Sequence, residues 1–165
     1  MPIVSGLLCL AGAGWMLNRH RKIAAIAELV HADLPGPGTT REGRDRLFSA
    51  LTERADQLRA ALALFPEAGI SIDLRIEGTH QLTLELTSSG AMSGRLSPVS
   101  PQLARDVESH IECVVLDEEI LLDLGGTFEG SEFLELLTVE ILHLPPDFEL
   151  SGDVHVSKRE RRPQN

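Results

Sequence analysis

The chain contains few aromatic residues and, over much of its second half, no basic ones. Of its 165 residues, five are Phe, one is Trp and none is Tyr. Proteins that bind single-stranded nucleic acids stack the bases on aromatic side chains, so this mode of binding is nearly excluded. From Asp106 to Ser157 there are fourteen carboxylates and no Lys or Arg. Because such a surface repels phosphate groups, we expect no nucleic-acid partner.

Cysteine is also scarce, because only Cys9 and Cys113 are present. Two cysteines this far apart form neither a disulfide framework nor a C-x-x-C motif. Both lie in apolar stretches, where cysteine usually packs as a small hydrophobic residue. We therefore expect a domain that folds through its hydrophobic core, without disulfides or a structural metal.

The negative charge is concentrated in one part of the chain. The whole chain has a net charge of −10, whereas residues 41–157 contain eight basic and twenty-two acidic residues. An excess of acid keeps a small domain soluble, and it also attracts a basic partner over long distances. The complete lack of basic residues from Asp106 to Ser157 favours a basic protein partner more strongly than composition usually does.

The N-terminal region combines an apolar run with a basic flank. Residues 2–17 include no charged residue, and Arg19, Arg21 and Lys22 follow at once. The run spans about 24 Å as a helix, and Trp15 lies near its end, where aromatic residues meet a membrane interface. This predicts a single membrane span with the main domain in the cytoplasm. A helix buried against the domain or a partner, and an interfacial helix, are the alternatives.

The composition divides the chain into four parts. Residues 1–32 are predicted to form the apolar N-terminal helix with its basic flank. Residues 33–40 contain two Pro and two Gly and are predicted to be a linker. Residues 41–157 are predicted to be an acidic α+β domain, and residues 158–165 a disordered basic tail.

Hydrophobic periodicity predicts the first elements of the domain. Apolar residues three or four positions apart predict a long helix over 41–65; they are Leu47, Leu51, Ala55, Leu58, Leu62 and Phe65. Strict alternation of apolar and polar residues predicts a hairpin of strands at 70–76 and 82–86. The small, polar stretch 88–97 is predicted to be a loop.

The second half of the domain is predicted to contain one further helix and several strands. Ser100 as N-cap and Pro101 as the first helical residue predict a helix that ends near Glu112. Strands are predicted at 113–116 and 120–124, around an acidic turn at 117–119.

Residues 133–144 fit either a helix or a strand. Leu134, Leu137 and Ile141 are spaced as on a helix, whereas β-branched Thr138, Val139 and Ile141 favour a strand, and we expect a strand. A last strand is predicted at 148–156. The order of elements predicts an α+β, two-layer sandwich of an antiparallel sheet and two helices, with a ferredoxin-like arrangement as the nearest known type.

The sequence contains no recognisable catalytic motif. No two histidines are three or four residues apart, and both the nucleophile elbow and the phosphate loop are missing. Four residues around a Pro-Pro turn could converge on a metal; they are His143, Asp147, Asp153 and His155. Such residues at strand ends and outer faces are usually solvated instead, so we predict no catalytic, cofactor or metal site.

These observations favour a membrane-tethered, non-catalytic domain that binds a protein partner through an acidic surface. The residues we expect to contact the partner are Asp117, Glu118, Glu119 and Asp123. A soluble binder of a basic protein, of the immunity-protein or secretion-chaperone type, is the first alternative. An enzyme whose site is assembled from distant residues is the second.

Overall fold

The computed structural model describes residues 21, 24–29, 33–62, 68–86, 92–124 and 130–158. The predicted membrane span at 2–17 and nearly all of the basic tail lie outside the described residues. The elements follow in the order α2 (Arg41–Leu62), β1 (Ala68–Ile76), β2 (His80–Leu86), β3 (Met92–Ser97), α3 (Pro101–Glu108), β4 (Cys113–Val115), β5 (Ile120–Asp123), α4 (Gly130–Glu135), the π-helix η1 (Leu136–Ile141) and β6 (Leu150–Lys158).

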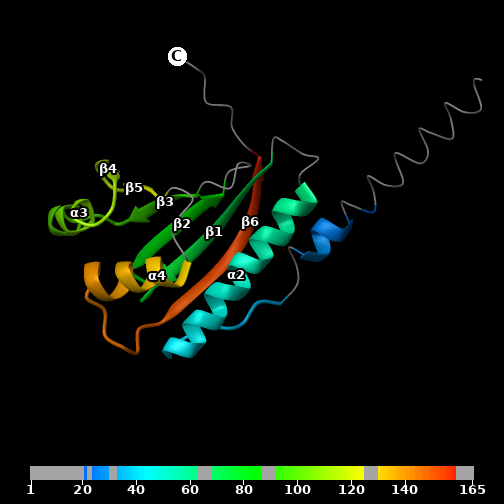
Figure 1. Ribbon diagram of the computed structural model, residues 1–165, viewed down its shortest axis with the longest axis horizontal. Coiled ribbons are helices and arrows are strands. Elements are labelled where there is room, and N and C mark those ends of the chain that lie inside the picture. The colour runs from blue at the N-terminus through cyan, green and yellow to red at the C-terminus, as the bar shows by residue number, and fades with distance from the viewer. Residues whose placement is uncertain are drawn as a thin grey trace, which may run out of the picture.

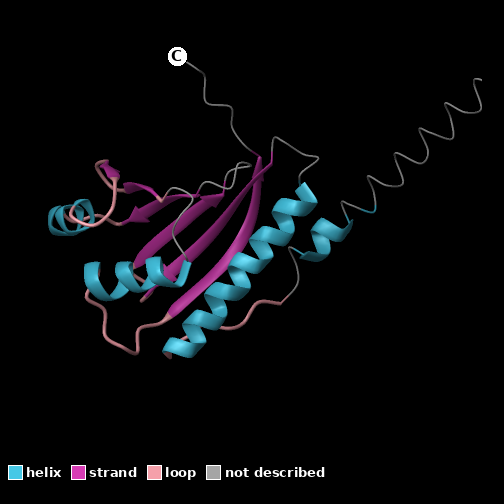
Figure 2. Cartoon of the chain, viewed as in Figure 1, coloured by secondary structure: helices cyan, strands magenta, loops and turns pink. Residues whose placement is uncertain are grey.

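The strands form one antiparallel sheet in the order β4-β5-β3-β2-β1-β6, and α2 and α4 lie on the same face of it (Figure 1). The chain is therefore an α+β domain with a helical layer on a sheet, as predicted; Figure 2 shows the two layers by colour. Every neighbouring pair of strands is antiparallel. The connectivity thus differs from a ferredoxin-like fold, whose split βαβ units contain parallel strands.

Helix α2 packs across β1 and β6 through the apolar stripe read from the sequence. Thr40 caps its first turn, because its side-chain Oγ1 accepts a hydrogen bond from the N–H of Gly43 at 3.1 Å. Leu51 and Leu58 in the stripe and Ile72 and Leu74 on β1 are fully buried. Alternation along β1 places their polar neighbours on the opposite, outer face of the sheet.

The segment predicted to be a linker lies against the domain. Gly38 and Leu150 form an antiparallel bridge, with N–H···O distances of 2.8 and 2.9 Å. The guanidinium of Arg54 donates to the carbonyl of Asp33 at 3.1 Å, and Leu34 packs against the core. Residues 33–40 therefore pack against the folded domain.

The short helix at residues 24–29 packs on the same core. Ile26 and Leu29 are half-buried there, whereas the other four residues of this helix are exposed. A truncation intended to leave the domain intact must therefore keep this helix.

Two stretches were predicted with the wrong type of secondary structure, and α3 ends at Glu108 instead of near Glu112. Residues 92–97 form strand β3 in the middle of the sheet, not a loop. Its residues are mostly small or polar, but Gly94 and Leu96 are buried and β3 pairs with both β2 and β5. Two-sided backbone hydrogen bonding stabilises this strand where side-chain propensity does not.

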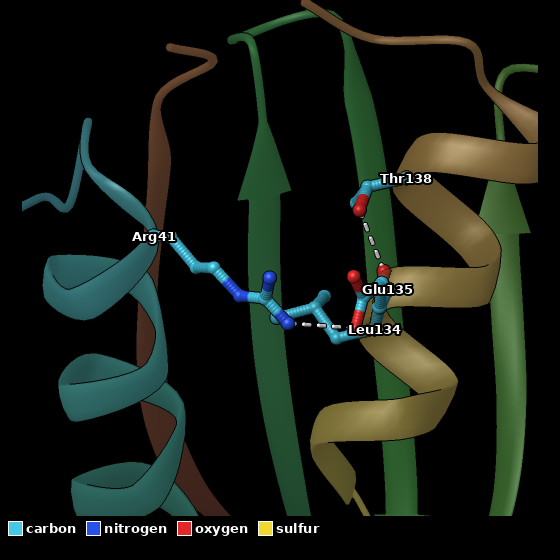
Figure 3. A network of polar contacts seen from close by, with 4 residues as sticks. All are labelled: Arg41, Leu134, Glu135 and Thr138. Carbon is cyan, nitrogen blue, oxygen red and sulfur yellow. Dashed lines mark hydrogen bonds and ion pairs between the residues drawn. The ribbon is translucent and has the colours of Figure 1, made fainter. Parts of the chain in front are cut away.

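Residues 130–141 are helical, so the strand expected over 133–144 was also wrong and the sandwich has a third helix. Leu134, Leu137 and Ile141 are buried, as the helical spacing indicated. The hydroxyl of Thr138 donates to the carbonyl of Leu134 at 2.6 Å, a bond that a helix permits (Figure 3). Glu135 accepts an ion-paired hydrogen bond from Arg41 of α2 at 3.1 Å, which joins the two helices.

Among the described residues, no helix is long and apolar enough to cross a membrane.

Candidate functional site

The β4–β5 hairpin forms one edge of the sheet. Val114 faces Leu121 across the hairpin, and the N–H of Asp123 donates to the carbonyl of Glu112 at 3.0 Å. At the turn, the N–H of Leu116 donates to the carbonyl of Glu119 at 2.8 Å. The paired ribbon thus extends from Glu112 to Leu116, beyond the three residues of β4 itself.

This edge exposes an unusual amount of apolar surface. Five large hydrophobic side chains are exposed among the described residues, and three of them are consecutive on this ribbon. Val114 is 60% exposed, Val115 38% and Leu116 43%. Adjacent exposed aliphatic residues on a sheet edge are a template for pairing with another chain.

The register places this apolar surface beside a polar one. Residues that face each other across antiparallel strands share a face of the sheet. Val114 and Leu121 therefore belong to the outer face, in a row that continues to Arg95, Thr83 and Asp73. The outer face changes from polar to aliphatic at β5 and β4.

Carboxylates lie at both ends of the aliphatic surface. A hollow of about 360 Å³ at the end of the hairpin is lined by Glu112, Val114, Leu121 and Asp123 among other residues. Glu112 and Asp123 face each other there, so that two carboxylates lie beside an aliphatic floor. A lysine or arginine side chain fits such a place, because its stem is apolar and its end is cationic.

The structure places the four predicted contact residues in three different settings. Asp117 and Glu118 are exposed at the tip of the hairpin. Glu119 is half-buried, and its Oε2 lies 3.4 Å from Nε of Arg95 on β3. Asp123 lies at the opposite end of β5, roughly 13 Å from Glu119 at 3.3 Å per residue.

Glu119 therefore has a structural partner, which the sequence did not reveal. Arg95 lies between Glu119 and Glu85, whose Oε1 is 3.9 Å from the guanidinium. A substitution of Glu119 would change this ion pair as well as the surface charge. Glu118 is therefore the better position at which to test the surface charge.

Sequence reasoning missed Glu112, Val114, Val115 and Leu116 as site residues. One signal could have found them: the run Cys-Val-Val-Leu at 113–116 is apolar throughout, whereas the strands at 70–76 and 82–86 alternate. A short apolar strand without alternation is either buried on both faces or a sheet edge with an exposed aliphatic surface.

Cys113 lies half-buried on the core side of β4. Burial raises the pKa of its thiol, and the negative charge of Glu108 raises it further. The thiol is therefore protonated at neutral pH and is a poor nucleophile.

We expect Cys113 to react with iodoacetamide more slowly than free cysteine between pH 7 and pH 9. The raised pKa moves the rise of the rate with pH to higher values. The measurement is the alkylation rate against pH in a Cys9→Ser variant, with glutathione as the control. A rate profile that coincides with that of glutathione contradicts the raised pKa of the Cys113 thiol.

The four residues considered as metal ligands do not come together. The ring Nε2 of His155 lies 3.3 Å from a carboxylate oxygen of Asp73 on the outer face. Asp153 accepts a hydrogen bond from the backbone N–H of Val154, and His143 lies two residues after the end of η1, with a φ of 49°. No group of three or more potential ligands that could hold a metal occurs in the described part of the chain.

A second hollow, of about 380 Å³, lies among β2, α3 and the end of η1. His80, Ser100, Asp106 and His143 contribute to its lining. The hydroxyl oxygen of Ser100 accepts the N–H of Leu103 as the N-cap of α3, and Asp106 accepts hydrogen bonds from Gln102. Ser100 and Asp106 are thus engaged in hydrogen bonds within α3. Among the described residues that line this hollow, no nucleophile is hydrogen-bonded to a base.

No protein-family model matches the chain, and comparisons with curated proteins and with solved structures find no similar protein.

Proposed function

We propose that this chain is a protein-binding domain and that its β4–β5 hairpin receives a basic protein. The observation that carries the proposal is the run of three exposed aliphatic residues at the sheet edge, Val114 to Leu116, with carboxylates at both ends. Apolar contact supplies affinity, and opposite charge supplies specificity and a fast association rate.

The charges around the hairpin support a basic partner. Glu112 and Asp123 lie at one end of the hairpin, and Asp117 and Glu118 at the other. Arg95, on the neighbouring strand β3, forms ion pairs with Glu119 and Glu85. The exposed carboxylates of Asp117 and Glu118 therefore give the tip of the hairpin a negative surface.

Reversing one charge tests the acidic surface. The probe is a fluorescein-labelled peptide of alternating Lys and Val, whose association rate is followed by stopped-flow anisotropy. We expect Glu118→Lys to lower the rate about threefold at low salt and to flatten its dependence on ionic strength. Glu53→Lys, which reverses an exposed charge on α2, is the matched control and changes the rate much less.

Equal rates for the two variants would remove the hairpin from the proposal. If the association rate falls equally in both variants, the peptide responds to the net charge of the protein and not to the hairpin.

The proposed location is the membrane surface, with residues 2–17 as the tether. This part of the proposal is supported by composition alone: sixteen residues without charge, followed by three basic residues. The alternative is a soluble binder in which the same residues pack against the domain.

Removal of residues 1–20 separates these two forms of the proposal. This variant keeps Ile26 and Leu29, which contact the core, so we expect it to fold. We expect full-length protein to remain with membranes after carbonate extraction, and the variant to be released. Full-length protein in the supernatant contradicts the tether, and a variant that unfolds points to a buried helix.

A further inference from the structure

Strand β4 directs part of its backbone away from the sheet. The backbone hydrogen bonds of Glu112 and Leu116 show that these residues, and Val114 between them, direct their backbone groups towards β5. In an antiparallel ribbon the alternate residues, Cys113 and Val115, then direct N–H and C=O outward. No strand follows β4 in the described sheet, so these four groups face outward at its edge.

The other edge of the sheet is different. Strand β6 begins with Leu150, whose N–H and C=O are both bonded to Gly38. Further along, β6 carries the charged or titratable side chains of Asp153 and His155, and such side chains protect edges from pairing. Strand β6 has one exposed aliphatic side chain, Val156, whereas three consecutive ones lie at β4, so β4 is the edge better suited to pair with another chain.

A second copy of this chain is a poor occupant of the β4 edge. Antiparallel pairing of two β4 strands centred on Val114 places Glu112 of one copy beside Leu116 and Asp117 of the other. Each end of the pair would bring Glu112 of one copy near the acidic turn that follows Leu116 in the other, and charges of the same sign repel. The charge of the hairpin favours a positively charged strand.

The two sides of β4 specify what such a strand contains. On the outer face, Glu112 and Val114 would lie beside every second residue of the added strand. A lysine or arginine there covers Val114 with its stem and reaches Glu112 with its charge. On the inner face, half-buried Cys113 and 38% exposed Val115 suit a small or β-branched residue.

We propose that β4 binds its basic partner by strand addition, and that the bound segment is extended and alternates basic with aliphatic residues. This inference rests on the proposed function and states the way in which the partner binds. Main-chain hydrogen bonds to Cys113 and Val115 provide part of the affinity, and alternate side chains provide the specificity.

Three peptides of about seven residues test this inference on the full-length protein. The first alternates Lys and Val. The second replaces Lys by Glu. The third is the Lys–Val peptide with N-methyl groups on the amides that would face β4. Binding is measured by fluorescence anisotropy, and hydrogen exchange of the Cys113 and Val115 amides is measured by NMR.

We expect the Lys–Val peptide to bind and to slow exchange at Cys113 and Val115. N-methylation should weaken binding about tenfold, because it removes the donors that pair with β4. Equal binding of the methylated peptide, or protection on β6 instead, overturns strand addition and leaves the acidic surface in place. A Glu–Val peptide that binds as well as the Lys–Val peptide overturns the proposed function itself.

A protein variant provides an independent measurement. Val115→Pro removes an outward N–H and leaves the bonds to β5, which is where edge strands tolerate proline. Val115→Thr keeps the N–H and the side-chain shape. We expect the Lys–Val peptide to bind the proline variant about tenfold more weakly than the threonine variant. Equal affinity for the two folded variants contradicts the inference.

Discussion

Replacing Arg44 by alanine is expected to lower the free energy of unfolding by about 3 kcal/mol. The side chain of Arg44 is 7% exposed on the first turns of α2. Its guanidinium donates to the carbonyls of Thr39, Phe148 and Pro146 at 2.9, 3.0 and 3.0 Å. It also lies over the ring of Phe148, at 3.8 Å from the centroid.

The cost arises from what the substitution leaves behind. The carbonyl oxygens of Thr39, Phe148 and Pro146 lose their charged hydrogen-bond donor. Each of them that stays buried is left without this hydrogen bond. Burial lowers the pKa of Arg44, while the charges of Asp45 and Asp147 oppose this shift, so the guanidinium stays charged at neutral pH. The segments before α2 and before β6 would both lose the side chain to which they are hydrogen-bonded.

The measurement is urea denaturation of Arg44→Ala beside Arg46→Ala, an exposed arginine on the same helix. The control is expected to stay within about 0.5 kcal/mol of the original protein. Equal midpoints for the two variants would show that Arg44 does not anchor these segments.

Replacing Gly152 by valine is expected to cost about 3 kcal/mol as well. A Cβ at this position would lie 2.8 Å from the carbonyl oxygen of Asp73 and 2.8 Å from a methyl group of Leu74. It would also lie 2.9 Å from a methyl group of Leu51 on α2. The backbone oxygen cannot rotate away, so β6 or α2 must move.

Ser151→Val is the matched control, because Ser151 lies next along β6 with its side chain on the outer face. A β-branched residue suits a partly exposed strand position on the outer face, so its effect should be small. Thermal unfolding of the two variants checks the prediction. A Gly152→Val protein as stable as the control would mean that β6 and α2 are not packed as closely as described.

The elements with strong patterns could be predicted from the sequence. The stripe of α2 and the alternation of β1 and β2 follow from the periods of helix and strand, and Ser100 and Pro101 begin α3 where expected. These signals are local, because each depends on residues within a few turns or one hairpin.

The two errors concern segments whose structure depends on distant neighbours. Strand β3 has little strand propensity, and only pairing with β2 and β5 reveals it. The helix of α4 and η1 contains β-branched residues that favour a strand in isolation. The burial of Leu137 and Ile141 on one side of the segment stabilises the helix.

The sequence indicates the acidic residues of the candidate site, but not how the fold arranges them. The acidic character of the hairpin is visible in the sequence at Asp117 and Glu118. The ion pair of Glu119 with Arg95 and the meeting of Glu112 with Asp123 depend on register. The position of β4 at the edge depends on the order of all six strands, which no local pattern encodes.

The most direct test of the central claim is a map of the peptide's footprint on the protein. The ¹⁵N-labelled full-length chain is titrated with the Lys–Val peptide, and amide shifts are followed by two-dimensional NMR. We predict that the largest shifts fall between Glu112 and Asp123. Largest shifts on α2 or β6, or none at saturating peptide, would contradict the assignment of the hairpin as the protein-binding surface.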